Sequence, residues 1–163
     1  MRHSHCVQIV VMIIFGCAIL AFTGCSKRSD MENSLIGRWE SVGLHVTVHT
    51  YHNSDSTLVI DFEENDLRTR FPVKPTVTVL NEDGTYYLEY RTKSDSLVAR
   101  PSGEWSVKDD SITMHQYVPA EYVYSYHVTL MPGKAEFRGM LDYDGDGKVD
   151  DEMIATSRKI GTR

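Results

Sequence analysis

The sequence contains little cysteine and fewer basic than acidic residues. Only three cysteines occur among 163 residues, and two of them, Cys6 and Cys17, lie in the N-terminal segment described below. The rest of the chain has a single cysteine and cannot form an internal disulfide, so its stability has to come from a hydrophobic core. The 17 Lys and Arg residues are outnumbered by 23 Asp and Glu residues, which gives a net charge of −6. Such an acidic chain is not expected to bind nucleic acid, which attracts basic surfaces.

Charged residues are absent from residues 7–23, an apolar run that follows a short start containing Arg2. Gly24 and Cys25 come directly after this run, and the next residues are polar. A basic start, an apolar stretch and small residues, in this order, are typical of a secretory signal peptide. A retained membrane anchor is the alternative, because the run approaches the roughly 17–25 residues that span a bilayer.

Residues 22–25, with the sequence FTGC, resemble the lipobox of bacterial lipoproteins. The resemblance implies cleavage before Cys25, a diacylglycerol on its sulfur and a fatty acid such as palmitate on its amine. Two or three acyl chains hold a protein durably on a bilayer, whereas one chain holds it only marginally. We therefore expect a signal peptide over residues 1–24, a flexible tether over residues 25–34, and a lipid anchor in the bacterial cell envelope. The outer membrane is the expected location, and its periplasmic and surface leaflets both stay open.

From Leu35 onward, apolar and polar residues alternate, and helical spacing never persists for three turns. Leu44, Val46 and Val48, for example, would share one face of an extended strand. Alternation rich in β-branched and aromatic residues is typical of β-strands. These alternating runs lie near residues 36–43, 44–52, 57–62, 76–81, 85–92, 103–107, 111–117, 122–131, 134–142 and 148–160. If the shortest pair of runs is merged, about eight or nine strands are expected. Residues 63–74 are the one stretch expected to hold a helical turn or a long loop.

Turn-forming residues separate the expected strands, as at Asn81–Gly84, Lys108–Asp110 and Met131–Lys134. Sequential strands joined by short turns form an antiparallel meander, which avoids exposed edges by closing into a barrel. An eight-stranded barrel encloses packed side chains or one small ligand. We therefore expect an all-β domain over residues 35–163, an up-and-down barrel of about eight strands. A two-sheet sandwich is the alternative architecture.

The expected barrel begins with residues 35–39, which have the sequence LIGRW. A Gly-X-Trp on the first strand resembles the lipocalins, and more closely the small lipocalin-like lipoproteins of the Bacteroidetes type. Segments 81–86 and 103–107 and a last strand with Arg158 are similar to the same pattern. The resemblance implies an up-and-down barrel without a required cofactor, with an apolar ligand inside some members. It also implies that Arg158 covers Trp39 and closes one end of the barrel.

The alternation of the last strand bears on this closure. It puts Arg158 on the same face as Ile154 and Ile160. A guanidinium on such an apolar face needs a partner, and a tryptophan ring offers a cation–π contact of about 0.5–2 kcal/mol. We therefore expect Arg158 to lie on Trp39.

Two functions of different kinds follow from these expectations. The first is a membrane-anchored lipoprotein whose barrel binds a small apolar or amphipathic ligand without catalysis. The second is a structural or interaction module with a filled barrel that contacts a protein or a glycan and carries a Ca²⁺-stabilised hairpin loop. An interior of about 300 Å³ or more favours the first function, and a filled interior favours the second. Tyr122, Tyr124 and Tyr126 share one strand face, which either fills the barrel or forms an outer aromatic patch.

Motifs of catalytic sites are absent from the sequence, which has no Gly-X-Ser-X-Gly elbow, no His-Glu-X-X-His and no phosphate-binding loop. An enzyme is therefore not expected. His45 and His49 would share a strand face, but about 13 Å of strand separates them, too far for one zinc ion. We expect these histidines to be solvated.

The segment from Asp142 to Glu152 gathers six carboxylates and a single basic residue, Lys148. Its start, Asp-X-Asp-X-Asp-Gly, matches that of a calcium-binding loop, in which alternating acidic residues bring oxygens to one ion. Met153 occupies the position of the usual bidentate Glu, so Asp151 or Glu152 would have to supply the last ligand. The alternative is a metal-free hairpin turn. We expect a weak Ca²⁺ site formed by Asp142, Asp144, Asp146, the carbonyl of Lys148, Asp150 and Glu152.

Overall fold

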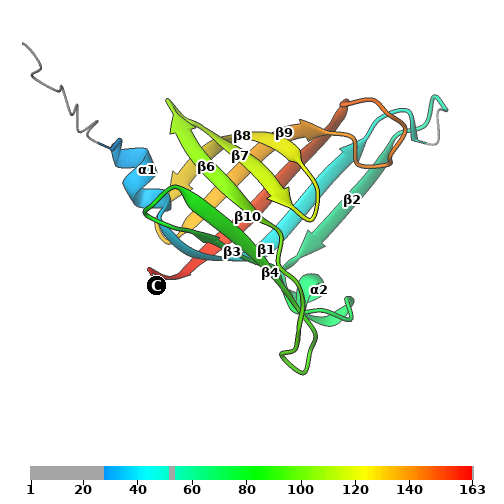
Figure 1. Ribbon diagram of the computed structural model, residues 1–163. Helices are drawn as coiled ribbons and strands as arrows, with labels where there is room; N and C mark the ends of the chain where they lie inside the picture. The colour runs from blue at the N-terminus through cyan, green and yellow to red at the C-terminus, as the bar shows by residue number, and fades with distance from the viewer. Residues whose placement is uncertain (1–27, 52–53, 163) are drawn as a thin grey trace, which may run out of the picture.

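The β-barrel expected from the alternation is confirmed (Figure 1). The computed structural model describes residues 28–51 and 54–162, and every element named below lies within these ranges. Along the chain the elements are α1 (Asp30–Leu35), β1 (Gly37–Val48), β2 (Leu58–Glu63), α2 (Glu64–Thr69), β3 (Val77–Leu80), β4 (Thr85–Arg91), β5 (Leu97–Ala99), β6 (Ser102–Lys108), β7 (Ser111–Val118), β8 (Tyr122–Met131), β9 (Lys134–Leu141) and β10 (Asp151–Gly161).

Eight of these strands close into an antiparallel ring. Neighbouring strands pair in the order β1, β3, β4, β6, β7, β8, β9, β10, and β10 pairs again with β1. The closing pair is long and runs from Arg38 opposite Gly161 to Thr47 opposite Glu152. Closure gives a partner to the first and last strands, which would be edges in an open sheet. The ring therefore excludes the two-sheet sandwich.

β1 is longer than the alternation predicts. The strands expected at residues 36–43 and 44–52 form one continuous strand, which has a bulge in its pairing with β10 between Ser41 and Gly43. The first part of β1 pairs with β3 and the second with β2, so β2 and β3 both lie along one side of β1. The predicted division is wrong because a bulge shifts the side-chain alternation by one residue, as a strand boundary also does.

Part of the expected tether is helical. Asp30–Leu35 form α1, and the Ser29 hydroxyl caps it by accepting a hydrogen bond from the backbone N–H of Glu32 at 3.0 Å. Arg28 adds an ion pair to Glu32 at 2.8 Å. Leu35 is completely buried and belongs to the barrel core. The tether predicted over residues 25–34 is therefore corrected, because a capped turn of helix with an apolar anchor begins at Asp30.

The hydrophobic core lies at the end of the barrel that α1 covers. α1 is blue in Figure 1, and the orange loop between β9 and β10 lies at the opposite end. α2 occupies the stretch in which a helical turn or a long loop was expected, and it packs beside β1 and β2. The buried members of the core are Leu35, Trp39, Leu80, Tyr86, Trp105, Ile112, Met114, Val128 and Ala135.

Candidate functional site

A cavity of about 310 Å³ lies inside the barrel, next to the core, and is partly open to solvent. Its lining is apolar or neutral, with no Asp, Glu, Lys, Arg or His among the described residues that form it. A neutral molecule suits such a lining, because a charged one would lose its hydration without gaining a partner. The lining residues are Trp39, Ser41, Leu44, Thr76, Thr78, Leu80, Leu88, Tyr90, Ile112, Met114, Tyr126, Phe137, Met153, Ala155 and Ser157.

A row of three tyrosines on β8 leads into this cavity. The rings of Tyr122, Tyr124 and Tyr126 stack along the strand, with centroids 6.1 Å and 6.3 Å apart. Tyr122 is 56% exposed, whereas Tyr126 lines the cavity. The face of β8 that carries these tyrosines therefore points into the barrel. The exposed end of the row, at Tyr122, indicates that the cavity opens away from α1.

Tyrosine hydroxyls gather around the cavity. Burial raises the pKa of Tyr86 to about 12, and the nearby hydroxyls of Tyr124 and Tyr90 add to this effect. Burial also raises the pKa of Tyr126, again with contributions from neighbouring tyrosines. These phenols are therefore protonated at neutral pH and can act as hydrogen-bond donors. Of these tyrosines, Tyr90 and Tyr126 line the cavity, where their hydroxyls can donate hydrogen bonds to a bound molecule.

Trp39 lies at the closed end of the barrel, but Arg158 does not cover it. The buried indole of Trp39 donates a hydrogen bond to the carbonyl of Leu35 at 2.7 Å. Lys159 lies opposite Trp39 in the β1–β10 pair, and its Nζ is 5.2 Å from the centre of the tryptophan ring system. Arg158 lies on the other face of β10 and donates to Glu40 at 2.7 Å. The predicted contact is wrong because adjacent residues of a strand face opposite sides.

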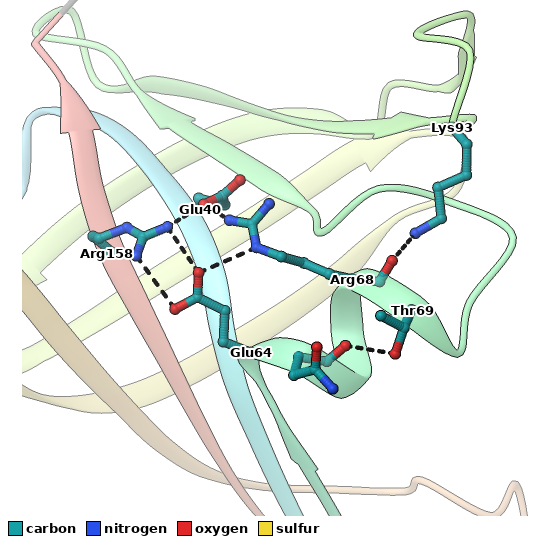
Figure 2. A network of polar contacts seen from close by, with 7 residues as sticks. Glu40, Glu64, Arg68, Thr69, Lys93 and Arg158 are labelled. Carbon is teal, nitrogen blue, oxygen red and sulfur yellow. Dashed lines mark hydrogen bonds and ion pairs between the residues drawn. The ribbon is translucent and has the colours of Figure 1, made fainter.

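Arg158 belongs instead to a polar network on the outer face of the barrel (Figure 2). Its guanidinium donates to Glu40 at 2.7 Å and to Glu64 at 3.1 Å. Arg68 of α2 donates to the same two carboxylates, at 2.6 Å and 3.1 Å. The hydrogen bonds from Arg68 and then Arg158 lower the pKa of Glu64. Lys93 extends the network by donating to the backbone carbonyl of Arg68.

Sequence reasoning missed this network because its members lie far apart along the chain. Glu40 and Arg158 are separated by 118 positions. The sequence does contain one indication of it. Both are charged residues in strands whose apolar and polar residues alternate, which favours a position on the outer face. The partner of each charge depends on strand register, which the alternation does not supply.

Three carboxylates of the acidic segment come together at the far end of the barrel. Asp142, Asp144 and Asp151 each place one oxygen within 4.8 Å of the others. Asp151 is completely buried, and its carboxylate accepts hydrogen bonds from the backbone N–H of His49 at 2.9 Å and of Tyr143 at 2.7 Å. Asp151 therefore ties the acidic loop to the end of β1 as well as completing the cluster.

The other predicted calcium ligands lie differently. Asp146 accepts hydrogen bonds from the backbone N–H of Lys148 at 2.8 Å and from its ammonium group at 3.0 Å. Asp150 has one buried oxygen that lacks a hydrogen-bond partner among the described residues. Glu152 forms an ion pair with Arg138 at 3.2 Å and is not part of the cluster. The sequence left Asp151 and Glu152 open as the last ligand. The structure places Asp151 in the cluster, because adjacent side chains of β10 point to opposite faces and Glu152 therefore points away from it.

The remaining predicted residues do not form a second metal site in the described part of the chain. No group of three potential metal ligands there includes a histidine. Cys25 and residues 7–23 lie outside the described residues, so lipidation stays a prediction. The histidines on the strands lie beside single carboxylates, in the pairs His45–Asp61, His115–Glu121 and His127–Asp110, at 3.7, 2.8 and 3.4 Å.

Two comparisons of the sequence and one property of the helices complete the description of the site. Within residues 28–51 and 54–162, no helix is both long and apolar enough to cross a membrane. A scan against models of known protein families gave no match, and a search of curated proteins found no relative. Because barrels of this kind serve many unrelated activities, a function has to follow from the chemistry of the site.

Proposed function

We propose that this protein is a membrane-anchored, lipocalin-like lipoprotein whose barrel binds a small apolar or amphipathic molecule without catalysis. The cavity of about 310 Å³ inside the closed barrel carries this proposal. Ligand cavities in proteins begin at about 300 Å³. Eight-stranded barrels are also of the size that holds one small ligand.

The lining indicates what kind of molecule fits. Leu80, Ile112 and Phe137 offer apolar contacts to a hydrocarbon body. Tyr90 and Tyr126 offer hydroxyl donors, and charged groups are absent from the described lining. The ligand that suits this arrangement is neutral, mainly hydrocarbon, and carries an acceptor such as a carbonyl or ether oxygen.

Binding of the neutral fluorophore N-phenyl-1-naphthylamine tests the cavity. Residues 26–163 contain every element and contact described above, so this segment is the form to use. We expect saturable binding with a Kd of about 10 μM, from the binding energy per atom that ligands of this size reach. Ala155 lines the cavity, and Ala155→Phe places a ring in it, which should weaken binding at least about tenfold because the ring takes the space of the probe.

The matched control is Thr129→Phe, which adds the same ring at an exposed position of β8. This variant should bind the fluorophore as the parent protein does. Equal binding by both variants, or no binding by the parent, would contradict the cavity proposal and favour the filled interaction module. Native mass spectrometry of the protein purified from its source would then identify any small molecule that remains bound.

A lipid on Cys25 would also orient the barrel. Arg28 follows Cys25 by three positions, and an extended chain covers at most about 11 Å over three residue steps. Arg28 lies at the α1 end, where it forms ion pairs with Glu32 and Glu82. The proposal therefore places the α1 end at the bilayer and the acidic loop away from it, with the cavity opening toward the aqueous side.

We also propose that the acidic loop binds Ca²⁺. The observation in favour is the approach of Asp142, Asp144 and Asp151 to within 4.8 Å of one another, within a loop that begins with the calcium-loop pattern. Close carboxylates repel one another, and a divalent cation removes this repulsion. With the bidentate Glu replaced by Met153, we expect a Kd of about 10⁻⁴–10⁻³ M.

Calorimetry and thermal unfolding with millimolar CaCl₂ test this site. We expect binding heat and a higher Tm, because an ion that binds only the folded state stabilises it. Asp144→Asn should remove both effects, whereas Asp109→Asn, in the exposed turn between β6 and β7, should keep them. If the parent protein shows neither binding heat nor a calcium-dependent rise in Tm, the loop is a metal-free turn.

A further inference from the structure

A groove of about 700 Å³ lies on the outer face of the barrel, away from the cavity. Its floor is formed by outward-facing residues of β1, β3 and β4, such as Arg38, Val77 and Glu89. Arg68 of α2 lines it, and so do Lys93 and Asp95 from the turn after β4. Lys93 joins these sides by donating to the backbone carbonyl of Arg68 (Figure 2). The groove is therefore bounded by side chains that are held in place.

Basic residues outnumber acidic ones in this groove, although the chain as a whole has a net charge of −6. Arg38, Arg68, Lys74, Arg91 and Lys93 line it, against Glu40, Glu89 and Asp95. These lining residues alone leave an excess of two positive charges. A concave surface with an excess of one sign of charge attracts ions of the other sign.

Each carboxylate in the groove is shared by more than one cation. Glu89 contacts Arg38 and Arg91, both at 3.3 Å, and Arg100 at 3.8 Å. Asp95 likewise contacts Lys74 at 2.6 Å and Arg91 at 4.0 Å. One carboxylate cannot use all the N–H groups of three guanidinium groups, which carry five donors each. Donor capacity for a further anion therefore remains.

The surroundings of Glu89 show which charge the groove favours. Glu89 is only 8% exposed, and burial by itself would raise the pKa of its carboxyl. The hydrogen bond and charge of Arg91, together with Arg38, nevertheless lower this pKa below its usual value. The cations thus stabilise a buried negative charge more than burial opposes it. The side chains of Arg38, Arg91 and Lys74 are 29–42% exposed, so a solute can also reach them.

We propose that this groove binds a small solute or glycan unit bearing two or more oxyanion groups, such as phosphate, sulfate or carboxylate. The arginines offer planar pairs of N–H donors that match such groups in both shape and charge. Lys74 and Lys93 add two further positive charges to the lining, so the groove offers cations to more than one anionic group. The groove is separate from the barrel cavity, so this site does not depend on the ligand proposed above.

Calorimetric titration with sodium pyrophosphate, and separately with citrate, tests the groove. The full chain is used in micelles of the neutral detergent dodecyl maltoside, which carries no competing charge. We expect binding at about 20 mM salt that weakens markedly at about 300 mM, because salt screens exposed charges. Arg38→Gln/Lys93→Gln should weaken binding at least about tenfold, the size expected for losing charge-assisted hydrogen bonds.

Two further variants keep the result interpretable. Lys93→Gln alone changes an exposed turn residue, so its loss of affinity reports on the groove even if the double variant does not fold. Lys108→Gln removes the same charge from the exposed end of β6, outside the groove, and should bind as the parent does.

A preference for pyrophosphate over citrate would assign phosphorylated solutes, and the reverse would assign polycarboxylates. Absence of binding to both anions, or equal losses in Lys93→Gln and Lys108→Gln, would overturn the proposal. Binding of N-phenyl-1-naphthylamine by Lys93→Gln should stay unchanged, which separates this site from the cavity.

Discussion

Replacing Cys25 with alanine is expected to abolish lipid attachment, so that no protein with a lipidated N-terminus at residue 25 is formed. The cysteine sulfur is the atom that would carry the diacylglycerol, and alanine offers no equivalent. Without acyl chains, which contribute about 0.8 kcal/mol per buried CH₂, the processed domain would have no anchor in the bilayer. The protein should therefore either leave the membrane fraction or accumulate as the uncleaved precursor.

Intact-mass spectrometry and membrane fractionation distinguish these results from the parent protein. The parent should have the mass of residues 25–163 plus its acyl groups and should stay with membranes. Cys17→Ala is the matched control, because it removes a cysteine from the apolar run and should leave the lipid in place. If Cys25→Ala keeps the mass and the fractionation of the parent, the lipoprotein proposal fails.

The membrane-bound parent protein also allows the orientation of the barrel relative to the bilayer to be tested. Asp83 lies in the turn beside α1, and Asp55 lies in the connection between β1 and β2 at the other end. The substitutions Asp83→Cys and Asp55→Cys each introduce a cysteine to which a fluorophore can be attached. A fluorophore at position 83 should be quenched by spin-labelled lipid headgroups more than one at position 55. Equal quenching would retain the anchor and reject only the orientation.

Replacing Trp39 with alanine is expected to lower the free energy of unfolding by about 3–5 kcal/mol, the usual loss for a buried aromatic residue. Trp39 is only 3% exposed and contacts both the cavity and the core. The substitution also removes the donor to the carbonyl of Leu35 and the ring beneath Lys159. Since domains of this size are stable by about 5–15 kcal/mol, the variant should be close to the limit of folding.

Urea unfolding followed by circular dichroism measures this change and identifies the residue that covers Trp39. Lys159→Ala should cost about 0.5–1 kcal/mol through the lost cation–π contact. In double-mutant cycles, Trp39 should couple to Lys159 and not to Arg158. Coupling to Arg158 alone would restore the arrangement that the sequence resemblance implies. A Trp39→Ala variant as stable as the parent would show that the closed end contributes little.

The sequence alone determined the class of fold, because alternation is a local property. Leu44, Val46 and Val48 share a face whichever strands lie beside them, and Val46 and Val48 are indeed buried. Turn residues such as those at 81–84 likewise mark reversals without reference to the rest of the chain. A closed meander follows from enough such strands in succession.

Register could only be decided by the tertiary structure. The alternation correctly grouped Arg158 with Ile154 and Ile160, but it took this apolar face to be the inner one. The cavity is instead lined by Met153, Ala155 and Ser157, and Ile160 is 46% exposed. A bulge between Ser41 and Gly43 and the pairing with β1 set which face points inward. A shift of one residue moves every side chain of a strand to the other face, so the partners of Trp39 and Arg158 depend on contacts between strands more than a hundred residues apart.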